Sequence, residues 1–245
     1  MTTTGRLTAR PIRRSSTVEE VMAYLREDIF DGNIPPEGVL TEGDVAAAFS
    51  VSRSTVRAAI AALVTEGILR QTPNKPAQVV RLTKKDVRDL YRVRIPIELE
   101  AVRITVLKRF RYPLPTEALE AAIDLERSPG RRPSDAIHAN MRFHEVLIGD
   151  VDNEPLARCF NALESGVKLA LAQSGHVLDV TKLGQEHRNL LMVLEHYRSR
   201  ARQCADEAGV DELRAENVDE DVWWPACKEM RDHLKDNERA ICGAI

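Results

Sequence analysis

One stretch near the N-terminus constrains the fold of this chain more than any other. Residues 52–66 begin with a serine that can cap a helix, repeat apolar side chains at helical spacing and end at Gly67, a residue that favours helix termination. Two short segments typical of strands follow at 68–71 and 77–80, on either side of a proline-containing turn. The sequence therefore predicts a helix that leads directly into a small two-stranded hairpin.

Two more helices are predicted ahead of this one. Residues 18–30 place apolar side chains on one face behind a Thr17 that can cap the helix, and a Pro-Pro pair prevents the helix from resuming. A short helix follows Thr41, and a tight turn at residues 50–52 separates it from the third helix. Three helices and a two-stranded wing are the parts of a winged helix-turn-helix, which the sequence predicts for residues 17–82.

The start of the third predicted helix has the composition of a DNA-reading surface. Its apolar stripe leaves the polar residues of the first two turns exposed. An arginine guanidinium can bond one guanine at two points, short hydroxyls reach phosphates or bases, and the positive end of the helix dipole attracts phosphate. The alternative is a solvated helix start that happens to be rich in arginine and serine. The exposed polar residues are Ser52, Arg53, Ser54, Thr55 and Arg57.

Charge is unevenly distributed along the chain. Residues 1–85 contain 12 Lys and Arg against 9 Asp and Glu, although the whole chain has a formal net charge of -3. A mildly basic front joined to an acidic remainder suits DNA binding at one end of the protein. Residues 1–16 are predicted to form a disordered basic arm.

The cysteines and the hydropathy pattern indicate the compartment. Cys159, Cys204, Cys227 and Cys242 are widely spaced, which favours reduced thiols over a disulfide framework or a zinc knuckle. No apolar run is long enough to cross a bilayer, and the N-terminus lacks the apolar core of a signal peptide. We therefore expect a cytoplasmic protein without membrane contact.

The remainder of the chain, residues 83–245, is predicted to be an all-α helical bundle, so the protein as a whole is mainly α. Aromatic residues make up only 4% of the chain, and aliphatic residues recur at helical spacing. The first helix of this part begins at Thr83, and Pro96 within it is expected to cause a kink. An acidic, poorly periodic stretch at 206–224 is predicted to be a loop. Further helices are predicted at 116–127, 134–149, 154–175, 180–205 and 226–242.

Three runs in the N-terminal module, Leu40–Glu42, Val51–Arg57 and Leu63–Leu69, resemble the DNA-binding domain of GntR-type transcription regulators. The resemblance implies that the exposed residues at the start of the third helix face DNA. Two positions depart from the family pattern. Gly43 stands where the family often has Arg or Lys, and Lys75 lies in a wing tip where the family usually has glycines. Lys75 is expected to contact DNA as well.

Four runs in the C-terminal part resemble the FCD-type ligand-binding domain of the FadR subgroup of this family. They are residues 89–94 with Glu98, residues 143–144 with 153–156, residues 186–188, and residues 230–234. In many members an Asp and three His from these runs bind a divalent metal ion. The corresponding residues here, which the resemblance implies as ligands, are Asn140, His144, His187 and His233.

The residue chemistry of these four positions agrees with a metal site. Asn140 and His144 are four residues apart and share a helix face. Imidazoles suit zinc and nickel, and an amide oxygen can complete such a site. Asn140 in place of Asp removes one negative charge, and the stretch between His187 and His233 is longer than is usual in the subgroup. The alternative is a metal-free polar cavity in which the histidines are hydrogen-bonded.

Arg94 and Tyr91 are candidate effector-binding residues. In the subgroup an arginine at the position of Arg94 commonly holds a carboxylate effector, because its planar fork matches a carboxylate at two points. The alternative for Arg94 is a salt bridge to Glu98, four residues further along the helix. Tyr91 either borders the effector pocket or serves only in packing.

These features together predict a DNA-binding transcription regulator, most often a repressor in this family, controlled by a small organic acid. A homodimer is expected to bind a palindromic operator in double-stranded DNA. One alternative is a regulator that contains no metal or that senses the metal itself. Another is a metal-dependent enzyme tethered to DNA, but the sequence has no HExxH motif and no nucleophile constellation. The prediction is therefore of a protein that is not an enzyme.

Overall fold

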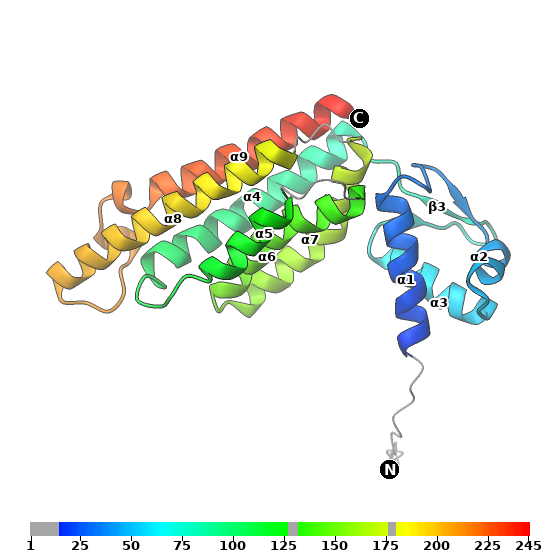
Figure 1. Cartoon of the computed structure of the whole chain (residues 1–245), viewed down its shortest axis with the longest axis horizontal. Coiled ribbons are helices and arrows are strands. Elements are labelled where there is room, and N and C mark those ends of the chain that lie inside the picture. Colours follow the sequence, from blue (N-terminus) through cyan, green and yellow to red (C-terminus); the bar gives the residue numbers. More distant parts are fainter. Residues whose placement is uncertain (1–14, 127–131, 176–179) are drawn as a thin grey trace, which may run out of the picture.

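The computed structural model describes residues 15–126, 132–175 and 180–245. The predicted basic arm, residues 1–16, lies outside the described residues except for Ser15 and Ser16, which begin the first helix. A small N-terminal unit of helices and short strands lies at one end of an elongated bundle of long helices (Figure 1). The fold class predicted from the sequence is confirmed: the protein is mainly α, with a winged helix-turn-helix followed by an all-α helical bundle.

The N-terminal unit contains the three predicted helices and one strand more than the sequence suggested. The two wing strands pair in antiparallel fashion, with Leu69 opposite Val79. A short strand ahead of the second helix pairs with the other edge of the wing, with Val39 opposite Gln78, so the sheet has three strands in the order β1-β3-β2. The elements are α1 (Ser15–Phe30), β1 (Val39–Leu40), α2 (Glu42–Phe49), α3 (Arg53–Thr65), β2 (Leu69–Arg70) and β3 (Ala77–Val79).

Local backbone geometry explains the ends of α2 and α3. Ser50 ends α2 in the left-handed region, with φ 54°, and Ser52 caps α3 by accepting a hydrogen bond from the backbone N–H of Thr55. Gly67 ends α3 with φ 76°; its N–H donates to the carbonyl of Val64, and the N–H of Ile68 donates to the carbonyl of Leu63. This pair of bonds is the Schellman motif, which requires a left-handed residue at the position of Gly67.

In the part of the C-terminal unit that the structure describes, all regular elements are helices, as predicted. α4 extends from Lys84 to Leu107 and contains Pro96, the residue at which the sequence predicts a kink. The stretch predicted as a loop at 206–224 begins while α8 is still helical and contains two single turns of 3₁₀-helix. The remaining helices are α5 (Thr116–Glu126), α6 (Pro133–Asp150), α7 (Glu154–Gln173), α8 (Val180–Ala208) and α9 (Trp224–Ala244).

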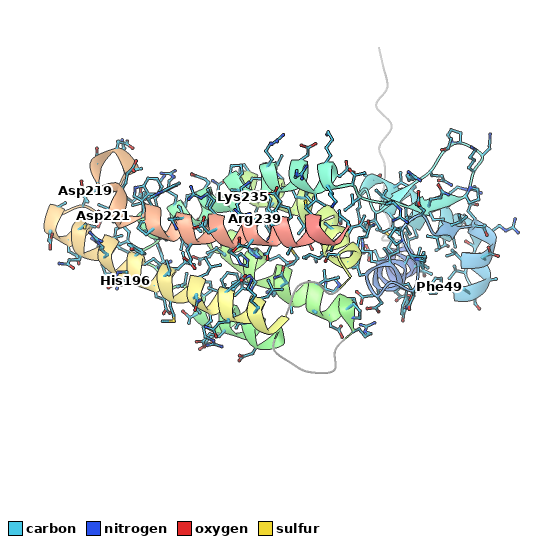
Figure 2. All side chains as sticks on the ribbon, turned by 90° about the horizontal axis from the view of Figure 1, so that it is seen from above. Phe49, His196, Asp219, Asp221, Lys235 and Arg239 are labelled. Atoms are coloured by element: carbon cyan, nitrogen blue, oxygen red, sulfur yellow. The ribbon has the colours of Figure 1, made fainter. Side chains whose placement is uncertain are left out.

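α4 is the central helix of this bundle. It packs against α6, α7, α8 and α9, and its middle turns are buried on most sides. Figure 2 shows the length of the molecule, with Phe49 of α2 at one end and Asp219 and Asp221 at the other. Because α4 is surrounded, any polar residue on its middle turns must find a partner inside the protein.

The two units contact each other through defined polar bonds. The amide of Gln173 in α7 donates to the carbonyl of Val80 (2.6 Å) and accepts from the N–H of Leu82 (2.9 Å), so it holds the segment between the units. A carboxylate oxygen of Asp31, just after α1, accepts from the N–H of Ser134 in the first turn of α6 (2.9 Å). The N-terminal unit therefore supplies a helix-capping contact to the bundle.

Among the described residues, no single helix is long and apolar enough to cross a membrane. Only the pair of α2 and α3 together satisfies the length and composition criteria, and these two helices are bent by 114° relative to each other.

Candidate functional site

The start of α3 presents a compact group of hydroxyls to the solvent. The hydroxyl of Ser52 lies 2.8 Å from the hydroxyls of both Ser54 and Thr55. Arg53 is exposed beside them in the first turn of α3. Since Ser52 also caps the helix, its oxygen is already engaged, and Ser54 and Arg53 are the more accessible members of the group. The structure thus brings together the residues that the sequence singled out at this helix start.

Arg57 is also exposed, but it is held by a carboxylate. Its Nε and Nη2 donate to the two carboxylate oxygens of Glu42 at 2.8 and 2.7 Å. The hydrogen bond to Glu42 raises the pKa of Arg57, and the same bond lowers the pKa of Glu42. Sequence reasoning did not give Glu42 a role, although it is part of the Leu40–Glu42 run.

Lys75 lies near Arg57 across a groove between α3 and the wing. Thr41, Glu42, Asn74 and Lys75 line this groove together with Arg57. The guanidinium of Arg53 lies close to Gly43 of α2. A Cβ atom added at Gly43 would be 3.8 Å from Nη2 of Arg53. The absence of a side chain at Gly43 therefore leaves space beside Arg53.

Three buried histidines from three helices meet inside the bundle. α6 supplies His144, α8 supplies His187 and α9 supplies His233, and one ligand nitrogen from each lies within 4.8 Å of the others. Nε2 of His187 is 3.2 Å from Nε2 of His144 and 3.1 Å from Nε2 of His233. The ring of Phe143 stacks on His187 with centroids 4.2 Å apart, which holds the plane of that imidazole.

Carboxylates bind two of these rings on their other nitrogen. Glu98 Oε2 lies 2.5 Å from Nδ1 of His144, and Glu186 Oε2 lies 3.0 Å from Nδ1 of His233. Ionised carboxylates only accept hydrogen bonds, so Nδ1 carries the hydrogen in both rings and Nε2 is left with a lone pair directed at the cluster. Burial lowers the pKa of His144 to about 3 and the pKa of His187 well below its usual value. Neutral imidazoles with converging lone pairs fit a divalent metal ion.

Arg94 and Tyr91 lie inside the bundle on α4, next to this cluster. Nε of Arg94 donates to Oε1 of Glu98 at 2.5 Å, and Nη1 donates to the Tyr91 hydroxyl at 3.3 Å. Burial alone would raise the pKa of Glu98, but Arg94 and His144 outweigh burial and lower this pKa to about 2. The salt bridge considered as the alternative for Arg94 is thus present. Nη2 of Arg94 remains buried without a hydrogen-bond partner among the described residues.

Two asparagines lie beside the histidine cluster. Asn140 is buried on α6, one turn before His144. Asn237 is buried on α9, one turn after His233, and its amide nitrogen is 3.2 Å from Nε2 of that histidine. Sequence reasoning did not single out Asn237. The available signal was its spacing of four residues from His233, which places both side chains on one helix face.

The fold and these sites define a DNA-binding transcription regulator with a ligand-binding helical domain. Comparisons with known proteins identify the class further. The profile of the bacterial regulatory proteins of the gntR family matches residues 17–79, and the profile of the FCD domain matches residues 89–217. The chain therefore belongs to the GntR family and has its FadR-like architecture, which confirms the resemblance found in the sequence.

Individual relatives agree with this assignment. The chain is 30% identical over 179 residues to the HTH-type transcriptional regulator YdhC of Bacillus subtilis, covering 71% of this chain and 75% of that protein. It is 27% identical over 229 residues to the gluconate operon transcriptional repressor of Bacillus subtilis, covering 88% and 90%. A solved GntR regulator from Rhodococcus sp. RHA1 shares the fold, with a TM-score of 0.69, 20% identity and coverage of 94% of this chain and 100% of that chain.

Proposed function

We propose that this protein is a repressor that binds a palindromic operator as a homodimer and is controlled by a small carboxylate bound beside a divalent metal ion. Repression, rather than activation, is supported by relatives from two Bacillus species that are named gluconate operon transcriptional repressors. In this proposal residues 17–82 bind DNA, residues 83–245 bind the effector and form the dimer, and the protein is cytoplasmic. No catalytic step is assigned to it.

The observation that carries the proposal is the exposed start of α3 within a complete winged module. Arg53 and Arg57 are the residues that reach base edges, because a guanidinium can bond guanine O6 and N7 together. Ser52, Ser54 and Thr55 are assigned to phosphates or bases, and Lys75 contacts the backbone from the wing. Two α3 helices in a two-fold dimer read two half-sites of a palindrome.

The metal ion in this proposal is held by Asn140, His144, His187 and His233. Support comes from the converging Nε2 lone pairs and from the carboxylates that bind Nδ1 of two rings. The ion supplies a positive charge to which a carboxylate can coordinate. Zinc and nickel are the candidates, since both accept imidazole ligands.

The effector carboxylate is placed between the ion and Arg94. The two carboxylates at the cluster are already paired with cations: Arg94 binds Glu98, and Lys182 lies 3.5 Å from Glu186. The charge of a bound divalent ion is therefore not cancelled by these carboxylates, which favours the binding of an anion. The unbonded Nη2 of Arg94 is a buried donor, and a buried donor without a partner is costly. A carboxylate would satisfy this donor, while Tyr91 holds the guanidinium from the other side.

DNA binding is tested with labelled DNA from the region upstream of the gene, by fluorescence anisotropy at several salt concentrations. Replacing Arg53 and Arg57 together by alanine is expected to lower operator affinity by at least about tenfold. Arg158→Ala is the matched control, because Arg158 is equally an exposed arginine in an ion pair, with Glu154 on α7. Absence of salt-sensitive, sequence-dependent binding with every effector tried would contradict the proposal.

The metal and the effector are tested on protein purified without a histidine tag. Elemental analysis is expected to find about one divalent ion per chain, and calorimetric titration with small organic acids is expected to lose its signal after chelation. Effector binding that is unchanged by chelation supports the metal-free alternative. A change in operator affinity on adding the ion alone supports a regulator that senses the metal.

A further inference from the structure

Asn237 is an unexpected residue at its position in α9. The buried side of this helix is otherwise formed mainly by apolar side chains, among them Met230, Leu234 and Ile241. Asn237 lies on the same side with 3% of its surface exposed. Burying an amide among apolar groups is unfavourable unless its polar atoms are bonded. An amide at this place therefore needs a polar partner inside the bundle.

The partner of Asn237 is the histidine cluster. The amide nitrogen of Asn237 lies 3.2 Å from Nε2 of His233, and the same Nε2 is 3.1 Å from Nε2 of His187. Because Glu186 binds Nδ1 of His233, Nε2 accepts the hydrogen bond from the amide. The lone pair that Asn237 engages is thus the one that a metal ion would use.

We propose that Asn237 is a fifth protein ligand of the ion, beyond the four residues named in the proposed function, on which this inference rests. When an ion takes the lone pair of His233, the hydrogen bond from the Asn237 amide is lost. Rotation of the amide by about 180° exchanges its nitrogen and oxygen, and the oxygen then faces the ion. Asn237 and Asn140 contribute two oxygens beside three imidazole nitrogens.

A fifth protein donor changes which metal the site selects. Protein-bound zinc generally takes four ligands and sometimes five, so a site with five protein donors and an effector carboxylate suits zinc poorly. Ions that accept six ligands, such as nickel and cobalt, accommodate five protein donors and leave one position for a carboxylate. Asn237 therefore determines metal specificity, and the donors of the site remain uncharged, since all five side chains are neutral.

The test uses the full-length protein and Ni²⁺ or Zn²⁺ in competition with a chromophoric chelator. Asn237→Leu is expected to weaken Ni²⁺ binding roughly tenfold or more and Zn²⁺ binding much less. The absorption spectrum of the Co²⁺-loaded variant is expected to intensify, because cobalt absorbs more strongly at lower coordination number. Asn237→Asp, which keeps an oxygen donor and adds a charge, is expected to bind Ni²⁺ more tightly than the wild type.

Ile241→Val is the control, since Ile241 is buried one turn further along the same side of α9 and has no polar atom. Its Ni²⁺ affinity and Co²⁺ spectrum are expected to match the wild type. Circular dichroism confirms that each variant is folded, and Asn237→Ala replaces Asn237→Leu if the larger side chain prevents folding. If the folded Leu or Ala variant has the Ni²⁺ affinity and the Co²⁺ spectrum of the wild type, the inference about Asn237 is overturned and the proposed function is not affected. A wild-type protein that binds no ion overturns the metal part of the proposed function as well.

Discussion

At the scale of single residues, hydrogen-bond partners decide what each histidine of the cluster can do. Glu98 and Glu186 each hold an Nδ1 atom, so the two Nε2 lone pairs turn inward. Neither carboxylate was assigned this role from the sequence, where Glu98 was considered only as a partner of Arg94. A contact between residues more than 40 positions apart leaves no spacing that a sequence pattern can reveal.

Asn140 provides a residue-scale prediction about charge. Asn140→Asp is expected to raise the affinity for a divalent ion by about tenfold or more, because it adds a negative charge to a group of neutral donors. The ion-free variant is expected to be less stable than the wild type, since the new carboxylate is buried. Chelator competition and urea unfolding with and without the ion measure the two effects. Unchanged affinity in the folded variant would place Asn140 outside the ion's ligands.

Gly67 provides a prediction about the backbone. Gly67→Ala is expected to reduce the free energy of unfolding by about 1 kcal/mol, because alanine is strained at φ 76° even though no neighbouring atom lies within 4 Å. Gly149→Ala is the control, since Gly149 lies in α6 without positive φ and with equally open surroundings. The control is expected to gain up to about 1 kcal/mol, as alanine favours helix. If both substitutions change the free energy of unfolding in the same direction, this contradicts the argument about the backbone at Gly67.

At the scale of elements, the pairing of α2 with α3 sets the state of the proposed DNA-binding surface. Glu42 in the first turn of α2 binds both nitrogens on one side of the Arg57 guanidinium in α3. This pair restrains Arg57 and cancels part of the positive charge at the helix start. α3 therefore presents two arginines in different states: Arg53 lies beside Gly43, and Arg57 is held by a carboxylate.

Glu42→Gln is expected to strengthen binding to unrelated DNA and to reduce the preference for the operator. Arg57 is then free to pair with phosphate, so the slope of log affinity against log salt steepens by about one. Anisotropy titrations with operator and unrelated DNA over a range of salt measure both quantities. Glu154→Gln releases the comparable Arg158 pair on α7 and is expected to change neither. An unchanged slope in Glu42→Gln would show that Arg57 does not reach phosphate.

At the scale of the whole molecule, α6 links the histidine cluster to α1 and to the residue that follows it, Asp31, in the N-terminal unit. Its first turn receives the carboxylate of Asp31 from the DNA-binding unit, and it carries Asn140 and His144 further along. His138, between these points, lies 2.9 Å from a carboxylate oxygen of Glu27 in α1. A rigid helix that contacts both units offers a direct route for coupling ligand binding to operator affinity.

Asp31→Ala is expected to weaken this coupling. The factor by which the effector changes operator affinity should fall towards one, while the affinities for effector alone and operator alone stay within about twofold of the wild type. A loss of about 1 kcal/mol in stability is also expected, as for other capping contacts. Asp236→Ala, which removes an exposed ion pair with Arg239 on α9, is the control. If the effector changes the operator affinity of Asp31→Ala by the same factor as in the wild type, the contact between Asp31 and α6 does not take part in the coupling.

The sequence by itself determined the helices, the wing and the exposed start of α3, because these depend on residue spacing, caps and glycine stops over short distances. It also indicated His144, His187 and His233, through runs of residues that resemble a known domain. Only the tertiary structure decided that their Nε2 atoms converge, that Glu98 and Glu186 orient them, and that Asn237 lies beside them. The sequence pattern likewise did not predict the strand β1 or the ion pair between Glu42 and Arg57. In each case the partners are brought together by packing between separate elements, and the free energy of a buried contact depends on geometry that no local spacing encodes.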